Sequence, residues 1–176
     1  EQYAQVMSYF NEVSAMLKSK GMIPRAWNDG LRFTKYSNYT LDSDIEICYW
    51  SGGNGCATIA EFVEAGHKVM SYIDVYMYYV LASWWDQWAN PKAEKIYDEW
   101  YPGKCSPSHN NGTVTEQTYT KPYPDFLLGT SFALWCDTPS HKTEDQIRTE
   151  LFERMRVVGG KSWNTHDNMP SYAEFK

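Results

Sequence analysis

Strand patterns and helix patterns alternate along most of this chain, and that alternation limits the folds open to it. Four segments carry the apolar alternation of strands: 22–30, 44–50, 67–72 and 129–137. Three segments carry apolar residues three and four positions apart, as amphipathic helices do: 4–20, 58–66 and 143–160. Strands separated by helices form parallel sheets with right-handed crossovers. The sequence therefore predicts an α/β fold with four parallel strands and flanking helices, half of a (β/α)8 TIM barrel.

The predicted helix boundaries rest on capping signals. Thr58 with Glu61, and Thr143 with Gln146, each form the T-x-x-E/Q pattern of a capping box, which satisfies free amide groups at a helix start. Glycine follows the apolar stripe of each predicted helix, and Gly159–Gly160 is expected to end the last one. The tail beyond that helix is polar and is expected to be irregular.

Two long segments separate the third strand pattern from the fourth. Residues 74–101 are a dense aromatic run that is predicted to be helical in part, and residues 103–125 are a polar excursion loop. A chain of 176 residues is long enough to bury one sizeable core. We therefore predict a single half-barrel segment over 1–176, in which 103–125 is an excursion and not a linker between domains.

The charge balance narrows the range of partners. The chain has 22 acidic and 16 basic residues, a formal net charge of −6, and no cluster of lysine and arginine, which argues against a nucleic-acid partner. No apolar run approaches the ~20 residues of a membrane-spanning helix, so no membrane span is expected.

Cysteine and histidine spacing gives no support for a metal site or a cofactor. The four cysteines have no C-x-x-C pair and the four histidines form no H-x-x-x-H pair. Cys48 and Cys136 fall inside strand patterns and are expected to be small buried hydrophobes. Cys56 and Cys105 fall in loops, and the sequence leaves open whether they form a disulfide.

Large aromatic side chains recur where the predicted strands end. Trp27, Trp50 and Trp135 stand near the ends of three strands, and the remaining strand runs into Asp74 and Tyr76. In parallel barrels, ligand sites lie at the C-terminal ends of the strands. Aromatic rings fill cores, and they also stack on the C–H faces of sugars. Recurrence at equivalent strand ends favours a small-ligand pocket with aromatic walls over independent core positions.

Four segments carry a family resemblance in their order and spacing: RAWNDGL, DIEICYW, GHKVMSYIDVYMYY and GTSFALWCD. Together they resemble the C-terminal half of the catalytic barrel of glycoside hydrolase family 20, which contains the β-N-acetylhexosaminidases and the lacto-N-biosidases. The resemblance covers most of the chain. It implies a retaining, substrate-assisted glycosidase, in which the 2-acetamido carbonyl of the substrate attacks the anomeric carbon.

The resemblance also implies roles for individual residues. Tyr76 would be catalytic, because its hydroxyl would hydrogen-bond the acetamido oxygen. Trp27, Trp50 and Trp135 would wall the −1 sugar pocket, and Asp137, with Asp74 at the same rim, would bind substrate. Many hexosaminidases have Glu at the position of Asp137 and Asp or Asn at that of Tyr78. Both departures are closer to the lacto-N-biosidases.

The Asp-Glu pair of the family follows a strand that precedes this segment of the barrel. The only adjacent Asp-Glu here is Asp98-Glu99, inside the aromatic run, with no strand or glycines before it. General acid catalysis typically contributes about 10²–10⁴ in rate. We therefore expect the isolated chain to be inactive or very slow.

The expected partners follow from this interpretation. They are an N-acetylhexosamine-containing oligosaccharide and either the missing N-terminal half-barrel or a second copy of the chain, since open strand edges favour pairing. The resemblance implies an extracellular or bacterial cell-surface location. Two alternatives are a non-catalytic half-barrel that binds sugar or self-associates, and an unrelated α/β domain whose aromatic residues are all core.

One ion pair is expected inside the sheet. Arg25 and Glu46 fall on the faces of Trp27 and Trp50 in neighbouring strands, where pairing would satisfy both charges. The alternative is that one of them lies in water near the barrel floor.

Overall fold

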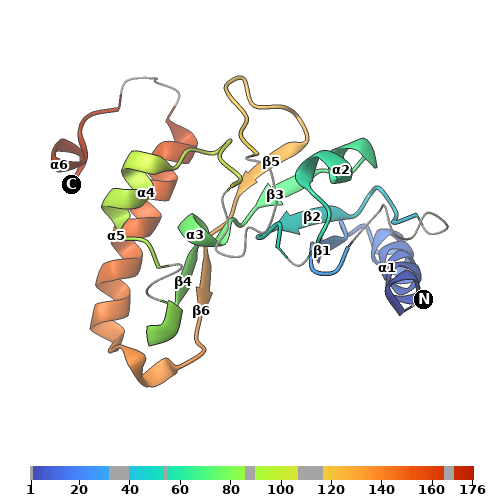
Figure 1. The fold of residues 1–176 in the computed structure, drawn as a ribbon, viewed down its shortest axis with the longest axis horizontal. Coiled ribbons are helices and arrows are strands. Elements are labelled where there is room, and N and C mark those ends of the chain that lie inside the picture. Colours follow the sequence, from blue (N-terminus) through green and yellow to red (C-terminus); the bar gives the residue numbers. More distant parts are fainter. Residues whose placement is uncertain (1, 32–39, 54, 86–89, 107–116, 165–168) are drawn as a thin grey trace.

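A computed structural model describes the chain except for residues 1, 32–39, 54, 86–89, 107–116 and 165–168 (Figure 1). The described helices are α1 (Gln2–Ser19), α2 (Ile59–Glu64), α3 (Asp74–Met77), α4 (Ala93–Glu99), α5 (Glu144–Trp163) and α6 (Tyr172–Phe175), with short 3-10 turns at Ser83–Trp85 and Pro139–His141. The described strands are β1 (Arg25–Trp27), β2 (Glu46–Tyr49), β3 (Val69–Ser71), β4 (Tyr78–Val80), β5 (Leu127–Thr130) and β6 (Ala133–Trp135). The middle of the 103–125 excursion lies outside the described residues.

Four of the strands form one parallel sheet in the order β1-β2-β3-β5. Along the chain α2 separates β2 from β3, and α3, β4 and α4 separate β3 from β5. Parallel strands in this order with helical crossovers are those of half a (β/α)8 barrel. The α/β prediction and its four parallel strands are therefore confirmed. α1 and α2 lie beside this sheet, and α4 and α5 lie together on the far side of the molecule (Figure 1).

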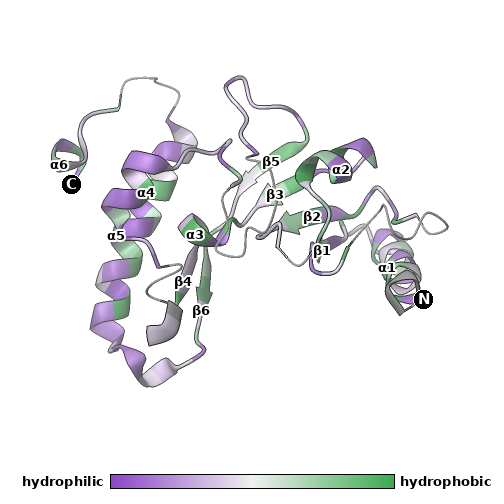
Figure 2. Ribbon diagram, in the orientation of Figure 1, coloured by the Kyte–Doolittle hydropathy of each residue, from purple (hydrophilic) through white to green (hydrophobic). Residues whose placement is uncertain are grey.

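The core of the sheet follows from its hydrophobic strands. Ile47 and Tyr49 of β2 and Val69 of β3 are fully buried, and they share a cluster with Ile59 and Phe62 of α2. β2 and β3 are coloured mainly toward the hydrophobic end of the scale, whereas hydrophilic and hydrophobic residues alternate along α5 (Figure 2). Thr58 caps α2 with the expected capping box, so this helix begins where the sequence predicts.

The strand predicted at 129–137 is wrong as a single element, because the chain forms two strands there. β5 pairs with β3, and β6 pairs with β4 in a separate two-stranded parallel sheet. β3 ends at Ser71, whose carbonyl accepts from the amide of Ser131 at 3.0 Å, so beyond this point β3 offers no further partner. β4 supplies the next ladder. It falls in the aromatic run predicted to be helical in part, and its Tyr-Tyr-Val composition favours a strand.

The C-terminal helix also differs from expectation. α5 begins at the predicted Thr143 capping box but continues through Gly159–Gly160 to Trp163. Gly160 faces α6, where a Cβ atom would lie 3.1 Å from the Phe175 ring. Close packing of α6 at this position favours glycine in the helix interior. The tail is not wholly irregular, since α6 forms in it.

β4 contacts α5 through Tyr79, which is fully buried. Its hydroxyl donates to Glu150 of α5 at 3.1 Å. The guanidinium of Arg154 and the ammonium of Lys142 lie 4.7 Å and 5.3 Å from the ring centroid. Burial would raise the pKa of Glu150, but hydrogen bonds from Lys142 and Tyr79 outweigh it and lower the pKa.

α1 is tied to the segment before β2 by Asp42. The carboxylate accepts from Ser14 at 2.7 Å and from Lys18 at 3.0 Å, and the Asp42 amide donates to Asn11 at 2.7 Å. The Ser14 hydrogen bond, followed by that of Lys18, lowers the pKa of Asp42 from 3.8 to about 2. Lys18 also pairs with Asp44, whose side chain is well exposed.

The expected Arg25–Glu46 ion pair is present. The two residues are register partners in β1 and β2, and Arg25 Nε donates to Glu46 Oε2 at 2.8 Å. The Glu46 side chain is 12% exposed and that of Arg25 is 42% exposed, so the pair is half in water.

The cysteines are all free, including Cys56 and Cys105. Cys48 is buried as expected, but the prediction for Cys136 is wrong: it follows β6 and is exposed. Among the described residues, His, Cys, Asp and Glu form no group of three that could hold a metal ion. Within the same residues, no helix has the length and apolar character needed to cross a membrane.

Candidate functional site

Five aromatic rings from neighbouring strand ends form one contiguous group, called here the aromatic cluster. Its members are Trp27, Trp50, Tyr72, Tyr78 and Trp135. Ring centroids are 4.7 Å apart for Trp27 and Tyr72, 6.1 Å for Trp27 and Trp135, and 5.5 Å for Tyr78 and Trp135. Trp50 stacks on Tyr78 at 5.9 Å with an interplanar angle of 11°. The structure thus brings together the three tryptophans singled out in the sequence.

The tryptophans of the aromatic cluster leave ring surface open to solvent. Trp27 is 37% exposed and Trp135 38%, while Trp50 is half-buried. Tyr78 is only 7% exposed and lies between Trp50 and Trp135. Burial raises the pKa of Tyr78, and the charges of Asp74 and Asp29 raise it further, so the hydroxyl stays protonated over the physiological range. The aromatic cluster therefore offers apolar ring faces and a neutral phenol.

The β4–β6 ladder holds Trp135 in place. The Trp135 carbonyl accepts from the Leu81 amide at 2.8 Å, and the Leu81 carbonyl accepts from the Thr138 amide at 2.7 Å. Asp137 lies within this fixed segment, and its side chain is exposed. The carboxylate is thus available to a ligand near the end of β6.

The other two predicted site residues lie on α3. Asp74 is fully buried and its amide donates to the carbonyl of Trp50 at 3.3 Å, so it lies beside the aromatic cluster. Tyr76 is 3% exposed and belongs to the hydrophobic core between α3, α4 and α5, with Met77, Ile96 and Trp100.

The hydroxyl of Tyr76 donates to Glu99 at the end of α4 at 3.2 Å. The ammonium of Lys104 lies 5.3 Å from the Tyr76 ring centroid and donates to the Glu99 carbonyl at 3.0 Å. Glu99, half of the Asp98-Glu99 pair, is therefore engaged with Tyr76 in this structure. The sugar-contacting role implied for Tyr76 stays a prediction.

Sequence reasoning missed several members of the site. Tyr72 ends the strand pattern 67–72 without a predicted role, and the only sequence signal at Tyr78 is its departure from many hexosaminidases. Asn28 and Asp29 stand near the end of the 22–30 strand pattern without a predicted role, although both form hydrogen bonds around Trp50. A polar pair directly after a tryptophan at a strand end is the signal that points to them.

The family model for the glycosyl hydrolase family 20 catalytic domain matches residues 1–166. The chain belongs to this family. The family 20 chain is 28% identical over 160 residues to the lacto-N-biosidase of Bifidobacterium bifidum, covering 89% of this chain and 13% of that protein.

Solved structures share its fold. Dispersin B superposes with a TM-score of 0.70 at 20% identity, over 93% of this family 20 chain and 49% of that one. A structure of the pneumococcal exo-β-D-N-acetylglucosaminidase StrH gives 0.67 at 22% identity, over 90% and 36%. The β-N-acetylhexosaminidase of Bacteroides fragilis gives 0.66 at 21% identity, over 99% and 32%. The family 20 chain thus spans half or less of each of these relatives.

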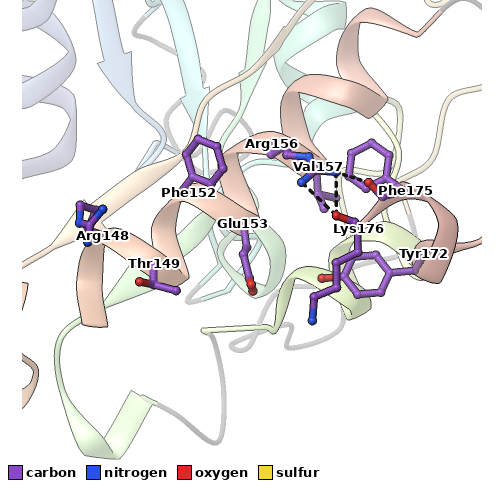
Figure 3. A pocket seen from close by; sticks show the side chains of 9 residues that line it. All are labelled: Arg148, Thr149, Phe152, Glu153, Arg156, Val157, Tyr172, Phe175 and Lys176. Atoms are coloured by element: carbon purple, nitrogen blue, oxygen red, sulfur yellow. Dashed lines mark hydrogen bonds between the residues drawn. The ribbon is translucent and has the colours of Figure 1, made fainter. Parts of the chain in front are cut away.

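A separate hollow of about 520 Å³ lies between α5 and α6 (Figure 3). Arg156 lines it and donates to the carbonyls of Phe175 and Lys176, with its guanidinium 4.8 Å from the Phe175 ring centroid. The Arg156 guanidinium therefore holds α6 against α5.

Proposed function

We propose that this chain is the C-terminal part of a retaining, substrate-assisted glycosidase that cleaves β-linked N-acetylhexosamine glycans. In this proposal the aromatic cluster walls the −1 sugar pocket. The observation that carries it is the convergence of Trp27, Trp50 and Trp135 at the C-terminal ends of parallel strands, with ring surface exposed. Membership of family 20 supports the reaction class.

The chemistry of the pocket suits an N-acetylated sugar. Indole and phenol rings bind the C–H faces of a pyranose and enclose an acetamido methyl group, and few polar groups are needed to orient the ligand. The exposed carboxylate of Asp137 is proposed to hold sugar hydroxyls, and Asp74 to support the pocket from beneath. The Tyr76 hydroxyl is proposed to exchange Glu99 for the acetamido oxygen when substrate binds.

The proton donor is proposed to come from outside this chain. In substrate-assisted retention an acid must protonate the leaving oxygen while the acetamido carbonyl attacks the anomeric carbon. We assign that acid, with its neighbouring Asp, to the N-terminal half-barrel that completes the family fold. The isolated chain is then a sugar-binding half with little or no turnover. The lacto-N-biosidase relative supports release of a disaccharide as the outcome in the whole protein. An extracellular or bacterial cell-surface location fits this substrate.

A second candidate is a half-barrel that self-associates. The observation favouring it is a set of exposed apolar side chains on the two outer helices: Val6, Tyr9 and Met16 on α1, and Phe152, Met155 and Trp163 on α5. The sheet order also leaves β1 and β5 at its two ends. Closure against an N-terminal half-barrel or a second copy would cover both features.

The test is hydrolysis and binding by the purified 176-residue chain. We expect no measurable release from a chromogenic N-acetylglucosaminide, but a tryptophan fluorescence change on titration with N-acetylglucosamine. Trp135→Ala should abolish that change, and Trp163→Ala, which removes an 87% exposed tryptophan of α5, should leave the affinity unaltered. Fast hydrolysis by the pure chain would refute the assignment of the acid to another segment.

A further inference from the structure

The residue directly after β1 fastens the end of β2. Asn28 is fully buried, and its side-chain oxygen accepts from the amide of Trp50 at 3.0 Å. Its side-chain nitrogen donates to the carbonyl of Ser51 at 2.7 Å. An asparagine amide carries one acceptor and one donor group, like a peptide unit. The Asn28 side chain therefore continues the β1–β2 hydrogen-bond pattern beyond the last register pair, Trp27 and Cys48, by bonding the Trp50 amide and the Ser51 carbonyl.

The next residue holds the ring itself. Asp29 is exposed, and its Oδ2 accepts from the indole Nε1–H of Trp50 at 2.9 Å. An indole has a single N–H and no acceptor, so one hydrogen bond at that atom selects one orientation of the ring. In this orientation the Trp50 ring stacks nearly parallel on Tyr78.

We propose that Asn28 and Asp29 are positioning residues for Trp50: Asn28 fixes its backbone, Asp29 fixes its indole plane, and together they set one wall of the aromatic cluster. The consequence for sugar affinity rests on the proposed function, whereas the positioning of Trp50 does not. Because Asp29 is exposed, its removal should alter the ring without unfolding the chain.

The first experiment reads the ring directly. A ¹H–¹⁵N spectrum of the labelled chain contains the indole N–H signals of its 8 tryptophans, and Trp50→Phe identifies the one from Trp50. We expect Asp29→Ala to shift that signal upfield and broaden it. Asp29→Asn keeps an oxygen acceptor and should restore it. Asp44→Ala, which removes an exposed carboxylate before the opposite end of β2, is the matched control and should leave the signal in place.

The second experiment measures the dissociation constant for N-acetylglucosamine with the same proteins. We expect Asp29→Ala to weaken binding about tenfold, which corresponds to one lost ordering hydrogen bond, and Asp29→Asn to stay within about twofold. Asn28→Asp keeps the acceptor for Trp50 but loses the donor to Ser51, and should move the Trp50 backbone amide as well as the indole signal.

The outcomes separate the two proposals. An unmoved Trp50 indole signal in Asp29→Ala overturns the positioning role, whatever the sugar affinity. A moved signal with unchanged affinity overturns the link from ring orientation to binding. A moved signal, in a chain whose parent form binds no N-acetylglucosamine, supports the positioning role and refutes the proposed function.

Discussion

Gly159 allows a quantitative test of α5 as one continuous helix. A Cβ atom built on Gly159 has no heavy atom within 4 Å, and this glycine is not among those with positive φ. Glycine in a helix interior costs about 1 kcal/mol relative to alanine. Gly159→Ala is therefore expected to stabilise the chain by about 1 kcal/mol.

Gly160 is the matched control, because it has the same helical setting but a close neighbour. A Cβ atom there lies 3.1 Å and 3.2 Å from two carbons of the Phe175 ring. Favourable carbon–carbon contacts fall at about 3.5–4.0 Å, so the ring of α6 must shift by a few tenths of an ångström. This strain offsets the gain in helix propensity, and Gly160→Ala should leave stability nearly unchanged.

Urea unfolding followed by circular dichroism measures the difference. With a slope of about 2 kcal/mol per molar urea, the Gly159→Ala midpoint should rise by about 0.5 M. If α5 instead ended at these glycines, position 159 or 160 would adopt a left-handed conformation and alanine there would destabilise the chain. A lower midpoint for Gly159→Ala would thus refute the continuous helix.

Three further substitutions test other parts of the fold. Asp42→Asn should lower stability at pH 7 by about 1 kcal/mol, less than the pKa shift alone implies, because the site is partly exposed to solvent. The folded pKa of Asp42 is below its usual 3.8, so its contribution to stability is present above about pH 4 and is lost as pH falls toward 2. Acid titrations of the parent chain and Asp42→Asn should therefore converge near pH 2. Gly103→Ala should prevent the native contact between Gly103 and Tyr119 in the 103–125 excursion, because the added Cβ would lie 1.8 Å from the Tyr119 carbonyl oxygen. An unchanged melting midpoint by circular dichroism would contradict this. Trp100→Ala should cost about 3–5 kcal/mol by emptying a fully buried site between α4 and α5, and a loss below 1 kcal/mol in urea would exclude tight packing there.

Local signals predicted the parts of the fold that local chemistry decides. The capping boxes at Thr58 and Thr143 place two helix starts, and alternation places β2 and β3. Recurrent tryptophans at strand ends indicated the aromatic cluster, because parallel strands bring their C-terminal ends to one edge.

The remaining features depend on contacts between segments distant in sequence. The split between β5 and β6 follows from where β3 ends and β4 begins, which no pattern within 127–135 records. α5 continues past Gly159 and Gly160, and the Phe175 ring of α6 packs on Gly160, so tertiary contact accompanies a helix that runs through a local stop signal. The position of Tyr76 in the hydrophobic core between α3, α4 and α5 likewise depends on a distant residue, since its hydroxyl donates to Glu99.

β4 places two neighbouring tyrosines in different layers of the molecule. Tyr78 stacks in the aromatic cluster, and Tyr79 lies between the charged groups of α5 and its preceding turn. Successive side chains of a strand point to opposite faces, so a shift of α5 that moves Tyr79 also tilts the backbone carrying Tyr78. Substitutions on α5, an outer helix, can therefore adjust the arrangement of the aromatic cluster without touching any of its rings.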